Sequence, residues 1–147
     1  MILGIDPGAS GALALLTPSG HVEGMIRLAS TEREVWDWLE ERAGHVSLAV
    51  LEKVQGFRGQ AAGASFKFGQ SYGFCRGILI AARVRVEGVT PAVWQRALSI
   101  PKRGAKSKAQ HKAVLRGRAQ EMFPGVKITN AEADALLLAE YGRRRGL

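Results

Sequence analysis

Three carboxylates in this sequence lie next to apolar or small residues. Acids in such surroundings can lie at a functional site formed by the folded chain. Asp6 ends the apolar run 2–5 and precedes Pro-Gly-Ala-Ser-Gly, which predicts a buried strand followed by a tight turn. Glu52 ends a second apolar run at 47–51. Asp134 falls in the first turn of a predicted final helix, among alanines that suit close packing on a sheet.

If the strands that end at Asp6 and Glu52 are parallel neighbours, both acids leave the sheet at the edge where α/β proteins build their sites. Converging carboxylates raise one another's pKa unless a cation is present. Hard oxygen ligands select Mg²⁺ or Mn²⁺, and two such ions ~4 Å apart can activate a water and stabilise the leaving oxygen of a phosphodiester. Each acid alone is also an ordinary turn residue, so spacing leaves that simpler interpretation open.

The elements that must position these acids follow from hydrophobic periodicity and turn residues. Strands are predicted at 2–5, 12–16, 22–28, 47–51 and 84–89, and helices from a Thr31 cap to a stop at Gly44, at 65–82, after Thr90-Pro91, at 107–123, and from an Asn130 cap to about Tyr141. Short turns join the first three strands, whereas helices separate the later ones. The expected fold is therefore one α/β domain, residues 1–147, with a mixed five-stranded sheet, three antiparallel strands then parallel strands, flanked by helices.

The charge balance indicates a polyanionic partner. The net charge is +8, and no acidic residue occurs from Gly88 through Gln120, a stretch rich in Lys and Arg. Such a stretch can form a phosphate-binding face, or simply a solvated helix face. The absence of a membrane-length apolar run and of a basic leader, together with the single Cys75, predicts a cytoplasmic protein without membrane contact.

Five segments, in order along the chain, resemble the RuvC family of Holliday-junction resolvases. They are Ile2–Gly11, Leu51-Glu52, Phe68–Gly73, Lys106–His111 and Ala133–Leu136. The resemblance implies an RNase H-like fold and a metal-dependent DNA endonuclease. It implies that Asp6, Glu52 and Asp134 hold two Mg²⁺ or Mn²⁺ ions, that no small-molecule cofactor is needed, and that Lys106 offsets phosphate charge. The Glu-Tyr-Gly-Arg ending is similar to the bacteriophage branch, whose members would work inside a bacterial host cell.

One position departs from the family pattern. The family usually has an acid or a histidine three residues before the last aspartate, and here that residue is Ala131. Glu132 is adjacent, but on a helix it points about 100° away. Three explanations stay open. Glu132 substitutes as a metal ligand and catalytic residue, which we favour; Asn130 orients a metal-bound water; or Ala131 makes the chain a weakened or inactive junction-binding protein.

The candidate DNA-binding residues belong to a glycine-rich loop and to the basic stretch. They are Phe57, Arg58, Lys102, Arg103, Lys106, Lys108, His111 and Lys112. An exposed Phe57 beside Arg58 suits stacking on unpaired bases, with packing back onto the core as the alternative. Each basic residue, His111 included, has an ordinary solvated position as its alternative.

The expected activity is resolution of four-way and other branched DNA junctions by paired symmetric nicks, which a two-fold homodimer would deliver. Gly69, Gly73 and Gly77 share one helix face, which predicts close packing on the sheet or on a second subunit. An actin-like sugar kinase or ATPase also places an aspartate at a strand end, but it needs a second such domain, which 147 residues do not supply. A non-catalytic junction-binding protein would share every basic feature.

Overall fold

The computed structural model describes residues 1–53 and 61–146, and five of its segments form one mixed sheet. The strands are β1 (Ile2–Asp6), β2 (Ala12–Leu16), β3 (Val22–Arg27), β4 (Leu48–Glu52) and β5 (Val86–Val89), in the order β3-β2-β1-β4-β5. β1, β2 and β3 are antiparallel, while β4 is parallel to β1 and β5 is parallel to β4. The predicted sheet is confirmed.

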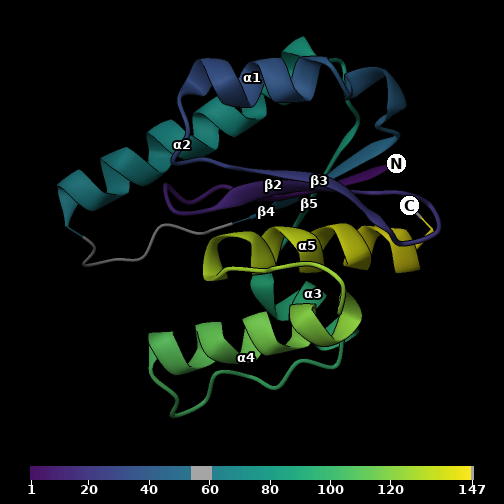
Figure 1. The fold of residues 1–147 in the computed structure, drawn as a ribbon. Coiled ribbons are helices and arrows are strands. Elements are labelled where there is room, and N and C mark those ends of the chain that lie inside the picture. The colour runs from purple at the N-terminus through teal and green to yellow at the C-terminus, as the bar shows by residue number, and fades with distance from the viewer. Residues whose placement is uncertain (54–60, 147) are drawn as a thin grey trace.

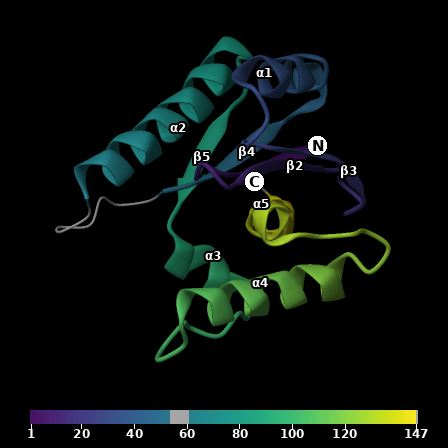
Figure 2. The same ribbon diagram turned by 60° about the vertical axis from the view of Figure 1, so that its left-hand side comes forward.

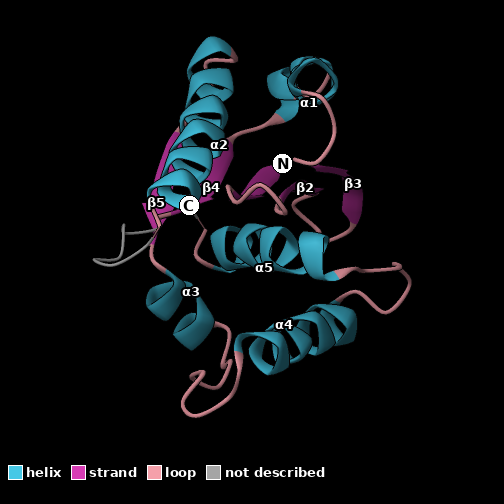
Figure 3. Cartoon of the chain, turned by 90° about the vertical axis from the view of Figure 1, so that its left-hand side faces the viewer, coloured by secondary structure: helices cyan, strands magenta, loops and turns pink. Residues whose placement is uncertain are grey.

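Helices cover both faces of the sheet, which makes the layered architecture clear in Figures 1 and 2. They are α1 (Glu32–Glu40), α2 (Ala62–Ala81), α3 (Pro91–Ala97), α4 (Lys108–Met122) and α5 (Asn130–Arg144), with a 3₁₀ turn at Ala43–His45. Helices α1 and α2 lie on one face, and α5 lies on the other with α3 and α4 beyond it (Figure 3). Within the described residues, no helix is long and apolar enough to cross a membrane.

Side chains of each strand alternate between two cores, one on each face of the sheet. Leu3 and Ile5 of β1 belong to the core beneath α1 and α2. Ile2, on the other side of the same strand, belongs to the core that includes α5. The central strands are therefore buried on both faces, which explains why they read as continuous apolar runs rather than as alternating ones.

Helix α5 approaches β1 closely because glycine and alanine lie between them. A Cβ added to Gly4 would stand 2.0 Å from the backbone oxygen of Ala135 and 2.4 Å from the nitrogen of Ala139. A Cβ added to Gly142 would stand 2.6 Å from Cγ2 of Val50. The small residues thus bring the helix backbone almost into contact with the sheet.

Helix boundaries differ from the predicted ones at the end of α1, at the start of α2, which begins at Ala62 rather than at 65, and at both ends of α5, which runs to Arg144 rather than to about Tyr141. Helix α1 has the predicted Thr31 capping box, but it ends at Glu40, and Gly44 lies in the following 3₁₀ turn. Helix α5 is capped by Thr129 rather than Asn130. Thr129 and Glu132 form a reciprocal capping box there, which satisfies two otherwise unpaired backbone N–H groups.

Candidate active site

Asp6 and Glu52 lie at the carboxyl ends of the neighbouring parallel strands β1 and β4. The register pairs Ile5 with Leu51, one residue before each acid. Because side chains alternate along a strand, both carboxylates lie on the α5 side of the sheet, opposite Ile5 and Leu51. The turn after Asp6 is held close to it, since Gly8 N donates to Asp6 Oδ1 at 3.3 Å.

Asp134 reaches the same region from α5, just after the first turn of that helix. Only 4 % of the residue is exposed. The charges of Asp6 and Asp134 both act to raise the pKa of Glu52, so the three acids lie within electrostatic reach of one another. The structure therefore brings together the three carboxylates that the sequence singled out.

Burial and mutual repulsion disfavour ionisation of two of these acids. Burial, reinforced by the charge of Asp6, raises the pKa of Glu52 from 4.5 to about 7. Burial also raises the pKa of Asp134, although the neighbouring Lys112 ammonium opposes that change. Perturbed carboxylates that share a cleft are typical of functional sites.

Lys112 of α4 is the cation that contacts the acids in this structure. Its Nζ donates to Asp134 Oδ2 and lies 4.0 Å from Asp6 Oδ2. Burial lowers the pKa of Lys112, but attraction to Asp134, with smaller contributions from Asp6 and Glu52, outweighs it and the pKa is raised. The family resemblance assigned the catalytic-site lysine to Lys106, and Lys112 was expected only among the DNA contacts. Lys106 is exposed in the loop before α4, and it pairs with no carboxylate of the described residues.

Trp94 of α3 forms a hydrogen bond with Glu52. Its indole Nε1 donates to Glu52 Oε1 at 2.8 Å, and the side chain is fully buried. This hydrogen bond opposes the rise in the pKa of Glu52, because it stabilises the ionised carboxylate. Trp94 therefore orients one of the three acids, a role that no spacing in the sequence had revealed.

The three acids form an oxygen donor set that suits a hard divalent cation. Asp134 Oδ1 is buried and has no hydrogen-bond partner among the residues described, a deficit that a bound cation would remove. Across residues 1–53 and 61–146, however, no three His, Cys, Asp or Glu side chains already stand at the spacing of a formed metal site. The three carboxylates are suitable ligands for a metal, but in this structure the ammonium of Lys112 occupies the position between Asp134 and Asp6.

The structure does not bring Glu132 to this site. Its Oε2 accepts hydrogen bonds from Thr129 N at 2.9 Å and from Thr129 Oγ1 at 2.7 Å. Its Oε1 accepts from Arg27 Nε at 3.0 Å. Burial raises the pKa of Glu132, but these hydrogen bonds outweigh burial and the pKa is lowered. Glu132 thus closes the start of α5, and Asn130, two residues earlier, is exposed.

A cleft of about 310 Å³ opens beside Glu52 and Asp134 between α3 and α4. Its lining also includes Pro91, Gln95, Arg103, Lys108, His111, Lys112 and Leu115. His111 Nε2 hydrogen-bonds Gln95 Oε1 at 3.2 Å, and burial followed by the charge of Lys106 lowers the pKa of His111. Lys102 and Lys106 are exposed nearby in the loop before α4, whereas Phe57 and Arg58 lie outside the described residues.

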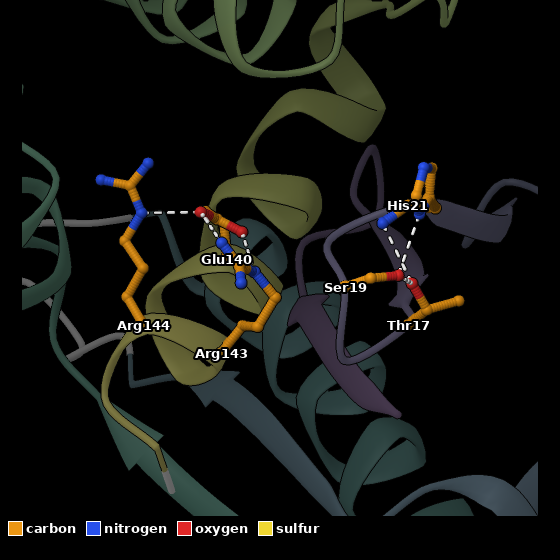
Figure 4. Close-up of polar contacts among 6 residues, drawn as sticks. All are labelled: Thr17, Ser19, His21, Glu140, Arg143 and Arg144. Carbon is orange, nitrogen blue, oxygen red and sulfur yellow. Dashed lines mark hydrogen bonds and ion pairs between the residues drawn. The ribbon is translucent and has the colours of Figure 1, made fainter.

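A further buried acid, Glu140, lies near the far end of α5 and provides a contrast. It accepts hydrogen bonds from Arg143 at 2.7 Å and from Arg144 at 2.6 Å, as Figure 4 shows. Burial raises the pKa of Glu140, but the two guanidinium groups outweigh burial and the pKa is lowered. Glu140 is therefore a fully paired structural carboxylate, unlike Glu52 and Asp134.

The whole chain is similar in structure to RuvC of Thermus thermophilus. One structure of this RuvC aligns with a TM-score of 0.59 at 17 % identity, over 99 % of this chain and 96 % of that one. T. thermophilus RuvC in complex with a Holliday junction substrate aligns with a TM-score of 0.58 at 18 % identity, over 99 % and 95 % of the two chains. No protein-family model and no curated protein sequence matches the chain. The similarity confirms the predicted RuvC-like, RNase H-like fold.

Proposed function

We propose that this chain, which has the fold of RuvC, is a metal-dependent endonuclease that resolves four-way and other branched DNA junctions by paired symmetric nicks. The observation that carries the proposal is the convergence of Asp6, Glu52 and Asp134 at one sheet edge. A cluster of three acids, two of them buried, is costly in a metal-free protein and becomes favourable once cations bind. The complex of T. thermophilus RuvC with a Holliday junction supports branched DNA as the substrate.

The proposed mechanism assigns each residue a role set by its position. Asp6, Glu52 and Asp134 hold the cations, and Trp94 keeps Glu52 in place through its indole hydrogen bond. Two Mg²⁺ or Mn²⁺ ions would supply an activated water and stabilise the leaving oxygen of the phosphodiester. Lys112 lies closest to the acids and offsets negative charge there.

The basic side of the cleft is the proposed path of the DNA backbone. Arg103, Lys108 and His111 line the cleft beside the acids, and Lys102 and Lys106 extend the charge along the preceding loop. Lysine and arginine contacts to phosphate supply most of the affinity of such complexes and make it dependent on salt. We retain Phe57 and Arg58 as proposed contacts to unpaired bases.

Helix α2 carries the proposed dimer interface. A Cβ added at Gly69, Gly73 or Gly77 would meet nothing within 4 Å, so these glycines do not pack against the described part of their own chain. Phe66 and Ile80 of the same helix are 67 % and 70 % exposed. Of the two sequence interpretations, packing on a second subunit is therefore favoured. A two-fold dimer would present two sites to a two-fold symmetric junction.

The test is cleavage of a synthetic four-way junction, compared with a linear duplex of the same arm sequence, in Mg²⁺ and in Mn²⁺. We expect paired nicks in the junction only. Asp6→Asn and Asp134→Asn should each reduce the rate at least ~100-fold, because each removes a charged metal ligand. The matched control is Asp37→Asn, which removes a half-exposed acid of α1. Cleavage by Asp6→Asn at the wild-type rate would refute the catalytic assignment.

A second candidate function is junction binding with weak or no cleavage. It is favoured by Ala131, since Glu132 is committed to the capping box and to Arg27 and so leaves that position without a ligand. Ala131→Asp distinguishes the two functions. If Ala131→Asp cleaves junctions much faster than wild type and binds them equally well, the chain is a weakened nuclease. If wild type already cleaves and the substitution does not raise the cleavage rate, the first proposal is supported.

A further inference from the structure

We infer that Lys112 is an exchangeable internal cation, which neutralises the acids before metal binds and turns to the DNA phosphate when metal displaces it. The inference rests on the proposed function and extends it. It makes metal binding and DNA binding reinforce each other. Metal binding to the acids releases Lys112 for a DNA phosphate, and DNA binding to Lys112 frees the acids for the metal. Such reciprocity is a thermodynamic necessity whenever two ligands compete with, or replace, the same internal contact.

The contacts of Lys112 support the first half of this exchange. Its Nζ donates to Asp134 Oδ2 and lies 4.0 Å from Asp6 Oδ2, so one ammonium faces two of the three proposed metal ligands. A divalent cation that bound the same oxygens would compete with the ammonium for them. Lys112 therefore competes with the metal for the carboxylate oxygens. When no metal is bound, its ammonium offsets the negative charge of the acids.

The surroundings of Lys112 support the second half. The side chain is 31 % exposed, and it lines the same cleft as Arg103 and Lys108, the proposed phosphate contacts. Lysine has a flexible four-carbon stem and a point charge that needs no fixed donor geometry. A modest rotation of that stem can therefore move the ammonium from the acids to the open cleft without a change in α4.

The acids do not have another cation of this kind among the residues that the structure describes. Arg27 is engaged with Glu132, and Arg143 and Arg144 with Glu140. Lys106 lies in the exposed loop before α4. The exchange consequently depends on one side chain, which makes it accessible to a single substitution.

The first experiment measures Ca²⁺ binding to the free protein by calorimetry, because Ca²⁺ occupies oxygen sites and its binding can be read without cleavage. Lys112→Met, which keeps an unbranched side chain only one atom shorter and removes the competing charge, should bind Ca²⁺ about tenfold more tightly than wild type. The control is Lys127→Met, an exposed lysine before α5 that forms no ion pair with the described residues. It should bind Ca²⁺ as wild type does.

The second experiment repeats the titration with a four-way junction present. The junction should raise the Ca²⁺ affinity of wild type by about tenfold more than it raises that of Lys112→Met, since only wild type releases Lys112 to phosphate. Equal enhancement in both proteins, or weaker Ca²⁺ binding by free Lys112→Met than by wild type, would overturn the inference. Those results would leave the nuclease proposal standing if the junction is still cut. Absence of Ca²⁺ binding in every variant would overturn both.

A third measurement is made on the wild-type chain and needs a variant only to assign one resonance. Reductive ¹³C-methylation labels the lysines, and Lys112→Arg identifies the resonance of Lys112. We expect Ca²⁺ to move this resonance toward the positions of exposed lysines, while the Lys127 resonance stays unchanged. A Lys112 resonance that is unaffected by saturating Ca²⁺ would show that no displacement occurs.

Discussion

Replacing Glu52 by glutamine should stabilise the metal-free protein at alkaline pH. The pKa of this carboxyl is raised from 4.5 to about 7, so the folded state binds a proton more tightly than the unfolded state does. The contribution of Glu52 to stability is therefore complete below pH 4.5 and is lost as the pH rises through about 7. At 1.36 kcal/mol per pH unit, that loss amounts to about 3 kcal/mol by pH 8.5. Glutamine keeps an oxygen acceptor for Trp94 and never ionises.

Urea unfolding in EDTA, at pH 4.5 and at pH 8.5, measures the effect directly. Glu52→Gln should match wild type at pH 4.5 and exceed its unfolding free energy by about 3 kcal/mol at pH 8.5, which corresponds to roughly 6–12 °C in Tm. Glu140→Gln is the matched control, because Glu140 is equally buried but has a lowered pKa. It should be less stable than wild type at pH 8.5, by about 1–3 kcal/mol, and the difference should shrink as the pH falls through the carboxyl range. If Glu52→Gln proved less stable at pH 8.5 as well, the reasoning about the buried acids would fail.

Three further outcomes are expected. Trp94→Phe removes the hydrogen bond that lowers the pKa of Glu52, so the pH–rate profile for junction cleavage should move to higher pH; an unshifted profile would count against the role given to Trp94. If α2 forms the proposed dimer interface, Gly73→Glu should lower the mass measured by light scattering to that of the monomer, whereas Gly117→Glu, at an equally open position on α4, should leave the mass unchanged. Glu132→Gln should lower the unfolding free energy by about 1 kcal/mol through the weakened cap and leave Ca²⁺ affinity as it is; a lost Ca²⁺ signal would restore Glu132 as a ligand.

The sheet could be predicted because its signals are local. Short turns between 2–5, 12–16 and 22–28 permit only an antiparallel arrangement, and a helix-length segment before 47–51 permits a parallel one. The helix ends were harder, because neighbouring polar residues such as Thr129 and Asn130 can each serve as a cap. Thr129 and Glu132 have the spacing of a capping box, a signal visible in the sequence that would have placed the start of α5 and explained Glu132.

The three acids could be predicted because each marks the end of a strand or the start of a helix, positions that the topology brings together. The contacts between distant segments could not. Trp94 and Glu52 are far apart in sequence, and nothing local links an indole to a carboxylate 42 residues away. Lys112 was hidden among other lysines. Its position three residues before Leu115 and seven before Ala119 places it on the buried stripe of α4, which distinguishes it from its solvated neighbours.

The close approach of α5 to the sheet has a consequence for mutational tolerance. A methyl group at Gly4 would meet backbone atoms of Ala135 and Ala139, which cannot move aside as a side chain can. Any larger residue there must lift the helix, and Asp134, adjacent to Ala135, would rise with it away from Asp6. Since displacement of a catalytic group by ~1 Å can reduce a rate ~100-fold, position 4 should be as restrictive as the acids themselves. The sequence constraint imposed by the proposed catalysis thus extends to a residue that has no side chain and lies beneath α5.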